Sequence, residues 1–201
     1  MKKTVATAKR LLCLVCALAL CLALAACGGS ANSISEQSEE ITQMNNAAPG
    51  GDIAAMPDGF AAPTDANKLA NAVSGSSFVG AINLASYRST GYFFVSGDSL
   101  TLTANFALYD TNGQSAATKY TDVTVALWQK SESTATYVTT VHFVADGTNQ
   151  TYTFTGLQSG GEYRFGITYS DSSAYRVSGT FSASPVTSAG AEEETPADSA
   201  A

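Results

Sequence analysis

The chain has 201 residues, a formal net charge of −7 at pH 7 and 45% hydrophobic residues. Because acidic residues outnumber basic ones, the surface repels phosphate groups, and no nucleic-acid partner is expected. All four cysteines lie within the first 27 residues, so the rest of the chain has no thiol for a disulfide framework, a thiolate metal site or a cysteine nucleophile.

The first 26 residues have the pattern of an export signal. Met1–Arg10 carries four basic residues, and Leu11–Ala26 is an apolar run of sixteen residues without charge or proline. A retained transmembrane helix is the alternative, but it needs about 20 apolar residues, so the run fits a signal peptide better. Removal of residues 1–26 leaves six basic residues against seventeen acidic ones, a net charge of −11.

The end of the apolar run resembles the lipobox of bacterial lipoproteins. Leu24, Ala25 and Ala26 precede Cys27, and Gly28–Ser30 follows it. The resemblance implies that Cys27 becomes the new N-terminus and carries a diacylglyceryl group together with a further acyl chain such as palmitate. Two or more lipid chains give lasting attachment, so we expect a lipid anchor at the extracytoplasmic face of a cell membrane or envelope, and no other cofactor. Ordinary secretion, with Cys27 left as a free thiol, is the alternative.

Two flanks of biased composition surround one stretch of domain size. Residues 27–71 are rich in small and polar residues and have no sustained apolar period, which predicts a flexible tether that ends in a short helix over Asp65–Val73. Residues 185–201 contain Glu192–Glu194 among small or polar neighbours, which predicts a disordered acidic tail. A single domain is therefore expected over residues 72–184.

This central stretch alternates apolar with polar residues and is interrupted by turn residues, which predicts an all-β sandwich. Every second residue from Leu100 to Leu108 is apolar, and Asp110–Gly113 follows with turn residues. The expected strands are 99–108, 122–129, 137–145, 151–157, 162–170 and 175–183, with one or two edge strands from 78–84 and 92–96.

The sequence from Tyr152 to Ile167, YTFTGLQSGGEYRFGI, resembles the passage from strand E to strand F of fibronectin type III domains. The resemblance implies a single seven-stranded immunoglobulin-like sandwich. It also implies that Leu157 caps strand E and that Tyr163 forms a tyrosine corner, with its hydroxyl bonded to backbone upstream. Two positions depart from the family. Ser159 replaces the usual turn proline, and no tryptophan stands in the strand-B position, where Ala104 or Phe106 lies, because Trp128 belongs to the following strand.

No pattern in the central stretch points to catalysis or to a metal. His142, the one histidine of the chain, lies in a predicted strand and faces away from its apolar neighbours. Asp110–Gly113 begins like a calcium-binding loop but lacks the downstream glutamate, so it fits a turn. Strand parity turns Trp128 away from Val125 and Leu127, so its ring could stack on a sugar or on a partner's side chain.

We therefore expect a lipid-anchored, extracytoplasmic protein that presents a β-sandwich as a non-catalytic binding or structural module. Its ligand, a protein or a glycan, is not identified by the sequence, because a sandwich of this kind hosts many functions. One alternative is a carbohydrate-binding surface component that uses exposed aromatic residues near Trp128. Others are an accessory subunit of an envelope complex, and an enzyme that would need Asp, Ser and His142 to converge.

Overall fold

The computed structural model describes residues 44–132 and 134–187, and the described residues from Asn45 to Thr187 belong to one compact unit. The predicted signal, the residues around Cys27 and residues 188–201 of the predicted acidic tail lie outside the described residues. The prediction of a disordered tail over 185–201 is wrong at its start, because Val186–Thr187 forms a strand that pairs with a sheet. Within the described ranges all regular secondary structure is β-strand. These ranges contain no helix long and apolar enough to cross a membrane.

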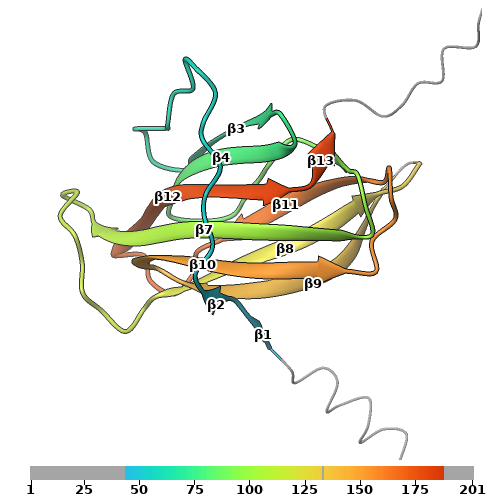
Figure 1. The fold of residues 1–201 in the computed structure, drawn as a ribbon. Helices are drawn as coiled ribbons and strands as arrows, with labels where there is room; N and C mark the ends of the chain where they lie inside the picture. Colours follow the sequence, from blue (N-terminus) through green and yellow to red (C-terminus); the bar gives the residue numbers. More distant parts are fainter. Residues whose placement is uncertain (1–43, 133, 188–201) are drawn as a thin grey trace, which may run out of the picture. The chain divides into compact units, whose positions relative to one another are not determined.

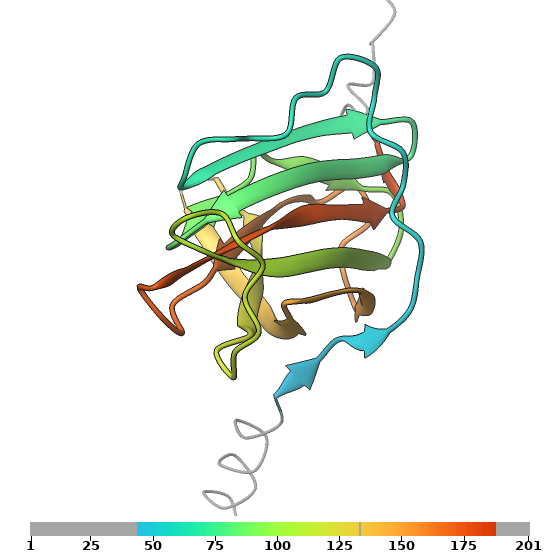
Figure 2. The same cartoon turned by 90° about the vertical axis from the view of Figure 1, so that its left-hand side faces the viewer.

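The strands form two sheets that lie face to face (Figures 1 and 2). The first, sheet A, has the order β1–β9–β8–β11–β6–β13, with β5 beside β11. Its strands are β1 (Asn45–Asn46), β5 (Arg88–Ser89), β6 (Phe93–Val95), β8 (Asp122–Lys130), β9 (Ala135–Val144), β11 (Glu162–Thr168) and β13 (Val186–Thr187). The second, sheet B, has the order β2–β10–β7–β12–β4–β3. Its strands are β2 (Ala48–Pro49), β3 (Lys68–Ser74), β4 (Ser77–Leu84), β7 (Ser99–Asp110), β10 (Asp146–Thr155) and β12 (Tyr175–Ser184).

The core lies between the sheets and is built from the alternate residues that face inward. Phe165 of β11 is fully buried, and its ring centroid lies 5.0 Å from that of Phe93 in sheet A and 6.2 Å from that of Phe181 in sheet B. These contacts join the two sheets through aromatic packing. The predicted all-β sandwich is confirmed, and most of the predicted long strands begin and end within two residues of their expected positions. The exception is β10, which begins at Asp146 and not at residue 151.

The predicted count of seven strands is wrong, because the described residues contain thirteen. The additional strands are mostly two or three residues long and lie at sheet edges, where they pair with longer strands. Such strands are too short to show an alternating pattern in the sequence.

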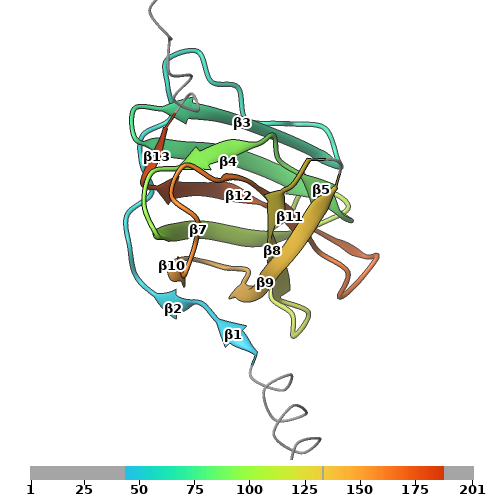
Figure 3. The same ribbon diagram turned by 90° about the vertical axis from the view of Figure 1, so that its right-hand side faces the viewer.

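Part of the predicted tether belongs to the sandwich. Near the start of the described residues, β1 pairs with β9 in sheet A and β2 pairs with β10 in sheet B. The chain therefore crosses from one sheet to the other at this edge (Figure 3). At the opposite edge the chain crosses again, because β12 belongs to sheet B while β13 pairs with β6 in sheet A. Both crossings cover edge strands that would otherwise be open to pairing with another chain.

The helix predicted over Asp65–Val73 is wrong, because Lys68–Ser74 forms β3. This strand pairs with β4 in a hairpin whose turn contains Gly75 with a φ of 59°. Between β2 and β3 the chain runs across the outer face of sheet B (Figure 1), where the Ala54 amide donates to the Ser182 hydroxyl at 2.9 Å. Long-range pairing with the sheet decides the conformation of this segment, not its local helix propensity.

The order of the strands also departs from that of an immunoglobulin-type sandwich. In that type, strand F and the strand that follows it share a sheet. Here β11 belongs to sheet A, but the next strand, β12, lies in sheet B between β7 and β4. The coarse architecture is therefore that of a sandwich, with its own strand order.

Candidate functional site

The predicted tyrosine corner lies in the connection between β10 and β11. The Gln158 amide donates a hydrogen bond to the hydroxyl oxygen of Tyr163 at 2.8 Å, and Tyr163 and Leu157 are both buried. A tyrosine hydroxyl bonded to backbone upstream is the geometry of a tyrosine corner. Because both side chains point into the core, they serve the fold and offer no contact to a ligand.

Trp128 lies on the outer face of sheet A. Its strand neighbour Leu127 is fully buried, so Trp128 points the opposite way and is half-buried. It stands opposite Tyr137 of β9 and Arg164 of β11, next to an irregularity in the pairing of β8 with β9. The Trp128 and Tyr137 rings meet edge to face, with centroids 5.5 Å apart and planes at 70°. The two rings therefore form a corner rather than a flat platform.

Further aromatic side chains continue this row across the sheet. The guanidinium carbon of Arg164 lies 5.1 Å from the centre of the Tyr92 ring. On the same outer face, a Cβ atom added to Gly166 would lie 2.9 Å from Cε2 of Tyr87 and 3.3 Å from Nε1 of Trp128, so both side chains cover this glycine. We call the four side chains Tyr87, Tyr92, Trp128 and Tyr137 the aromatic band.

The aromatic band is accessible to a ligand. The exposed fractions of its tyrosines are 48% for Tyr87, 37% for Tyr92 and 52% for Tyr137. The sequence predicts an outward Trp128 but does not identify Tyr87, Tyr92 or Arg164 as its neighbours. The alternation around Arg164, between buried Tyr163 and Phe165, shows that it faces outward, but only the pairing of β11 with β8 places it beside Trp128.

An open hollow of about 330 Å³ lies at one end of the aromatic band, beside the connection from β8 to β9. We call it the hairpin hollow, and its lining residues are Tyr92, Lys130, Ser131, Glu132, Thr134, Ala135 and Arg164. Its volume is at the small end of the range for ligand sites. The Lys130 ammonium lies 2.6 Å from the Glu162 carboxylate and 5.2 Å from the centre of the Tyr92 ring, so this lysine is already paired.

Two nitrogen donors of this surface have no acceptor. Nε1 of Trp128 and Nε of Arg164 are both buried, and neither has a hydrogen-bond partner among the described residues. Native proteins satisfy most buried donors, and an unsatisfied one costs about 1–3 kcal/mol. Both atoms therefore lie beneath the surface of the aromatic band, without a partner among the described residues.

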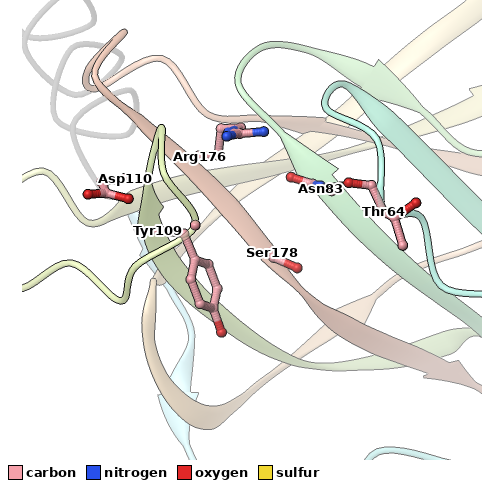
Figure 4. A pocket seen from close by; sticks show the side chains of 7 residues that line it. Thr64, Asn83, Tyr109, Asp110, Arg176 and Ser178 are labelled. Carbon is pink, nitrogen blue, oxygen red and sulfur yellow. Dashed lines mark hydrogen bonds between the residues drawn. The ribbon is translucent and has the colours of Figure 1, made fainter.

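A second hollow, of about 220 Å³, lies on the outer face of sheet B. Figure 4 shows Ser178 between Tyr109 and Arg176 on one side and Asn83 and Thr64 on the other. Its polar groups are engaged in the fold: the Arg176 guanidinium donates to the Thr111 carbonyl at 2.9 Å, and the Asn83 amide donates to the Thr64 carbonyl at 2.8 Å. These groups hold neighbouring segments in place, so this hollow is the weaker candidate for a ligand site.

The loop at Asp110 is a turn. The Asp110 carboxylate accepts hydrogen bonds from the amides of Gln114 and Asn112, at 2.8 and 2.9 Å. The bond from the Gln114 amide lowers the pKa of the Asp110 carboxyl below its ordinary value. Among the described residues, no three His, Cys, Asp or Glu side chains gather in a way that could hold a metal ion.

His142 is paired with one carboxylate. Its Nδ1 lies 2.9 and 3.1 Å from the two carboxylate oxygens of Asp122. Within the described part of the chain, no serine hydroxyl is hydrogen-bonded to the imidazole. A serine–histidine–aspartate arrangement also needs the serine at the second ring nitrogen, so two of the three groups converge here and the third does not.

The scan against protein-family models finds none that matches the chain. The search of curated proteins finds no match either.

Proposed function

We propose that this chain is a lipid-anchored, extracytoplasmic lipoprotein whose β-sandwich serves as a non-catalytic binding module, with the aromatic band as its ligand site. The observation that carries the binding proposal is the row formed by Tyr137, Trp128, Arg164 and Tyr92 on the outer face of sheet A. Exposed aromatic and arginine side chains are the residues that contribute most to binding at protein surfaces.

The anchoring proposal rests on the sequence at Leu24–Cys27. A cysteine that follows Leu24, Ala25 and Ala26 at the end of an apolar leader and precedes glycine resembles the lipobox of bacterial lipoproteins. The described part of the domain carries no cysteine that could compete for the lipid. The module would then be held at the cell membrane or envelope by hydrocarbon chains and not by a spanning helix.

Mass spectrometry of the mature protein tests the anchor. We expect the wild-type chain, expressed in a bacterium, to begin at Cys27, to carry a diacylglyceryl mass there and to enter the detergent phase. The Cys27→Ser variant should lack the acyl mass and enter the aqueous phase. A wild-type N-terminus at another residue, or an unmodified Cys27, would show ordinary secretion instead.

A fibronectin type III-like character is proposed for the unit made of β10, β11 and their connection. It is supported by the sequence between Tyr152 and Ile167 and by the bond from the Gln158 amide to Tyr163. These two strands lie in different sheets, as strands E and F do in immunoglobulin-like sandwiches. The proposal covers this unit alone, since β12 occupies a different sheet from the one that type of sandwich requires.

Binding to isolated envelope fractions tests the module. We expect the lipidated wild-type protein, in detergent, to sediment with the insoluble envelope fraction of the expressing cell. The Tyr137→Ala variant removes a ring that is 52% exposed and should lower the bound fraction. Tyr120→Ala, which removes a ring that is 39% exposed and belongs to another part of the surface, is the matched control. Equal sedimentation of both variants and the wild type would contradict a role for the aromatic band.

A further inference from the structure

We propose that the ligand of the aromatic band is a neutral glycan, with pyranose rings held against Trp128 and Tyr137 and sugar hydroxyls held by Arg164. This inference rests on the proposed binding function and names the ligand class of the same site. Three features of the surface support it: donors without acceptors, rings set at a corner, and a balance of charge in the hairpin hollow.

The first feature is the guanidinium of Arg164. Among the described residues it lies against the face of the Tyr92 ring. Its Nε is buried without an acceptor, so the donors left for a ligand are the two terminal nitrogens. The other arginines of the domain behave differently, because Arg88 and Arg176 both donate to backbone carbonyls. A guanidinium has five N–H donors and no acceptor of its own. A ligand for this site must therefore supply several oxygen acceptors, as a sugar does.

The second feature is the corner between Trp128 and Tyr137, whose planes meet at 70°. The face of an aromatic ring is electron-rich, and the C–H groups on one face of a pyranose ring carry a slight positive charge, so the two surfaces attract. At such a corner, a sugar ring can lie flat against one aromatic ring while its edge contacts the other.

The third feature is the charge of the hairpin hollow. Arg164 and Lys130 line it together with Glu132, and Glu162 pairs with Lys130 at 2.6 Å. Two positive and two negative side chains thus cancel, which gives an anionic ligand no net attraction. The acidic sequence as a whole, with its net charge of −7, also repels anions. A neutral sugar fits this balance better than a uronic acid or a phosphate.

The length of the row fits a short stretch of a polysaccharide. Tyr137, Trp128 and Arg164 stand opposite one another on β9, β8 and β11, and neighbouring strands lie about 4.8 Å apart, so the row is about 10 Å long before Tyr92 extends it. Trp128 and Tyr137 touch, and Arg164 separates this pair from Tyr92, so the row is not a continuous apolar patch of the kind that marks protein interfaces. Rings with a charged donor between them suit sugar rings that carry hydroxyls.

Titration calorimetry with defined oligosaccharides tests the inference. The probes are cellohexaose, mannohexaose and chitohexaose as neutral chains and hexagalacturonate as an acidic chain, each with the full mature protein in detergent. We expect at least one neutral chain to bind and hexagalacturonate to bind more weakly. Tyr137→Ala and Arg164→Lys should each weaken the neutral complex about three- to tenfold. Arg164→Lys keeps the positive charge and removes the forked donors.

Matched substitutions outside the site are the controls. Tyr120→Ala and Arg176→Lys should leave the affinity for the neutral chain unchanged within about twofold. Binding of hexagalacturonate alone, or unchanged affinity of the Arg164→Lys and Tyr137→Ala variants, would overturn the glycan inference. If no neutral oligosaccharide binds while Tyr137→Ala still lowers sedimentation with the envelope, the binding module stands and the glycan inference is overturned. If neither assay responds to Tyr137→Ala, the proposed function itself is wrong.

Discussion

The hydroxyl oxygen of Tyr163 lies 2.8 Å from the amide nitrogen of Gln158, five residues upstream in the connection between the two sheets. The tyrosine ring is buried in the core, with 1% of its surface exposed. One side chain thus fixes both the core and the turn that carries the chain from β10 to β11. Because β11 also carries Arg164 and Gly166, this turn positions part of the candidate ligand site.

Replacement of Tyr163 by phenylalanine should destabilise the domain by about 1–2 kcal/mol. The ring is kept, but the Gln158 amide loses its acceptor in a part-buried place. Urea unfolding measures the change in the free energy of unfolding. Tyr152→Phe is the control, since the Tyr152 hydroxyl makes no hydrogen bond within the described residues, and its change in unfolding free energy should be smaller. Equal changes in the two variants would show that the hydrogen bond contributes nothing.

Replacement of Gly179 by alanine should destabilise the sandwich by about 2 kcal/mol or more. A Cβ atom there would clash with the backbone carbonyl of Asn105 and lie 2.9 Å from Cα of Phe106 on β7, and backbone atoms cannot move aside without shifting the strand. Gly97→Ala is the matched control, because its added Cβ would have its nearest atom at 4.0 Å. A fall in the melting temperature for Gly179→Ala alone is expected. A stable Gly179→Ala variant would mean that β7 and β12 are not so closely paired.

The stability of the domain should fall in acid partly through Asp146. The hydrogen bond from the Thr148 hydroxyl, at 2.6 Å, is the main cause that lowers the pKa of the Asp146 carboxyl in the folded state. The pKa of an aspartate in an unfolded chain is about 3.9. The ionised Asp146 therefore stabilises the fold above that pH, and this stabilisation is lost as the pH falls through the lower pKa of the folded state. The difference in unfolding free energy between wild type and Asp146→Asn should therefore shrink from pH 6 to pH 2.5. Thr148→Ala should reduce the pH-dependent part, and a difference that stays constant with pH would contradict this assignment.

Replacement of Gly166 by alanine should weaken ligand binding more than folding. The added methyl group would lie 2.9 Å from the Tyr87 ring and 3.3 Å from the indole nitrogen of Trp128, so it would displace the Tyr87 side chain, which is 48% exposed and can move into solvent. We expect reduced sedimentation with the envelope fraction and a change in unfolding free energy below about 1.5 kcal/mol. Full retention of binding would show that the arrangement around Gly166 does not belong to the site.

Local alternation predicted the long strands well. The expected strand at 175–183 is observed as Tyr175–Ser184, and the expected strand at 122–129 as Asp122–Lys130. The same alternation predicted that Trp128 and His142 face away from the core, which the buried residues beside them confirm. These features depend on a period of two along one strand, so they can be seen in a short stretch of sequence.

The flanking segments were predicted less well. Asn45–Asn46, Ala48–Pro49 and Lys68–Ser74 were expected in a tether or helix, yet all three are strands. Each lacks a strong apolar pattern and takes its conformation from the longer strand beside it. The pairing of β1 with β9, for example, joins Asn45 to Val141, which lies 96 residues further along the chain. A pattern within a short window carries no information on such a partner.

The sequence by itself was enough to predict three features: the apolar leader that ends before Cys27, the β-rich domain that follows it, and the outward direction of Trp128. Tertiary structure alone decided the neighbours: it placed β12 in sheet B and set Arg164 and Tyr137 on either side of Trp128. The physical reason is that the face of a side chain follows from local backbone geometry, whereas strand order and register follow from how all the buried faces fit together in one core.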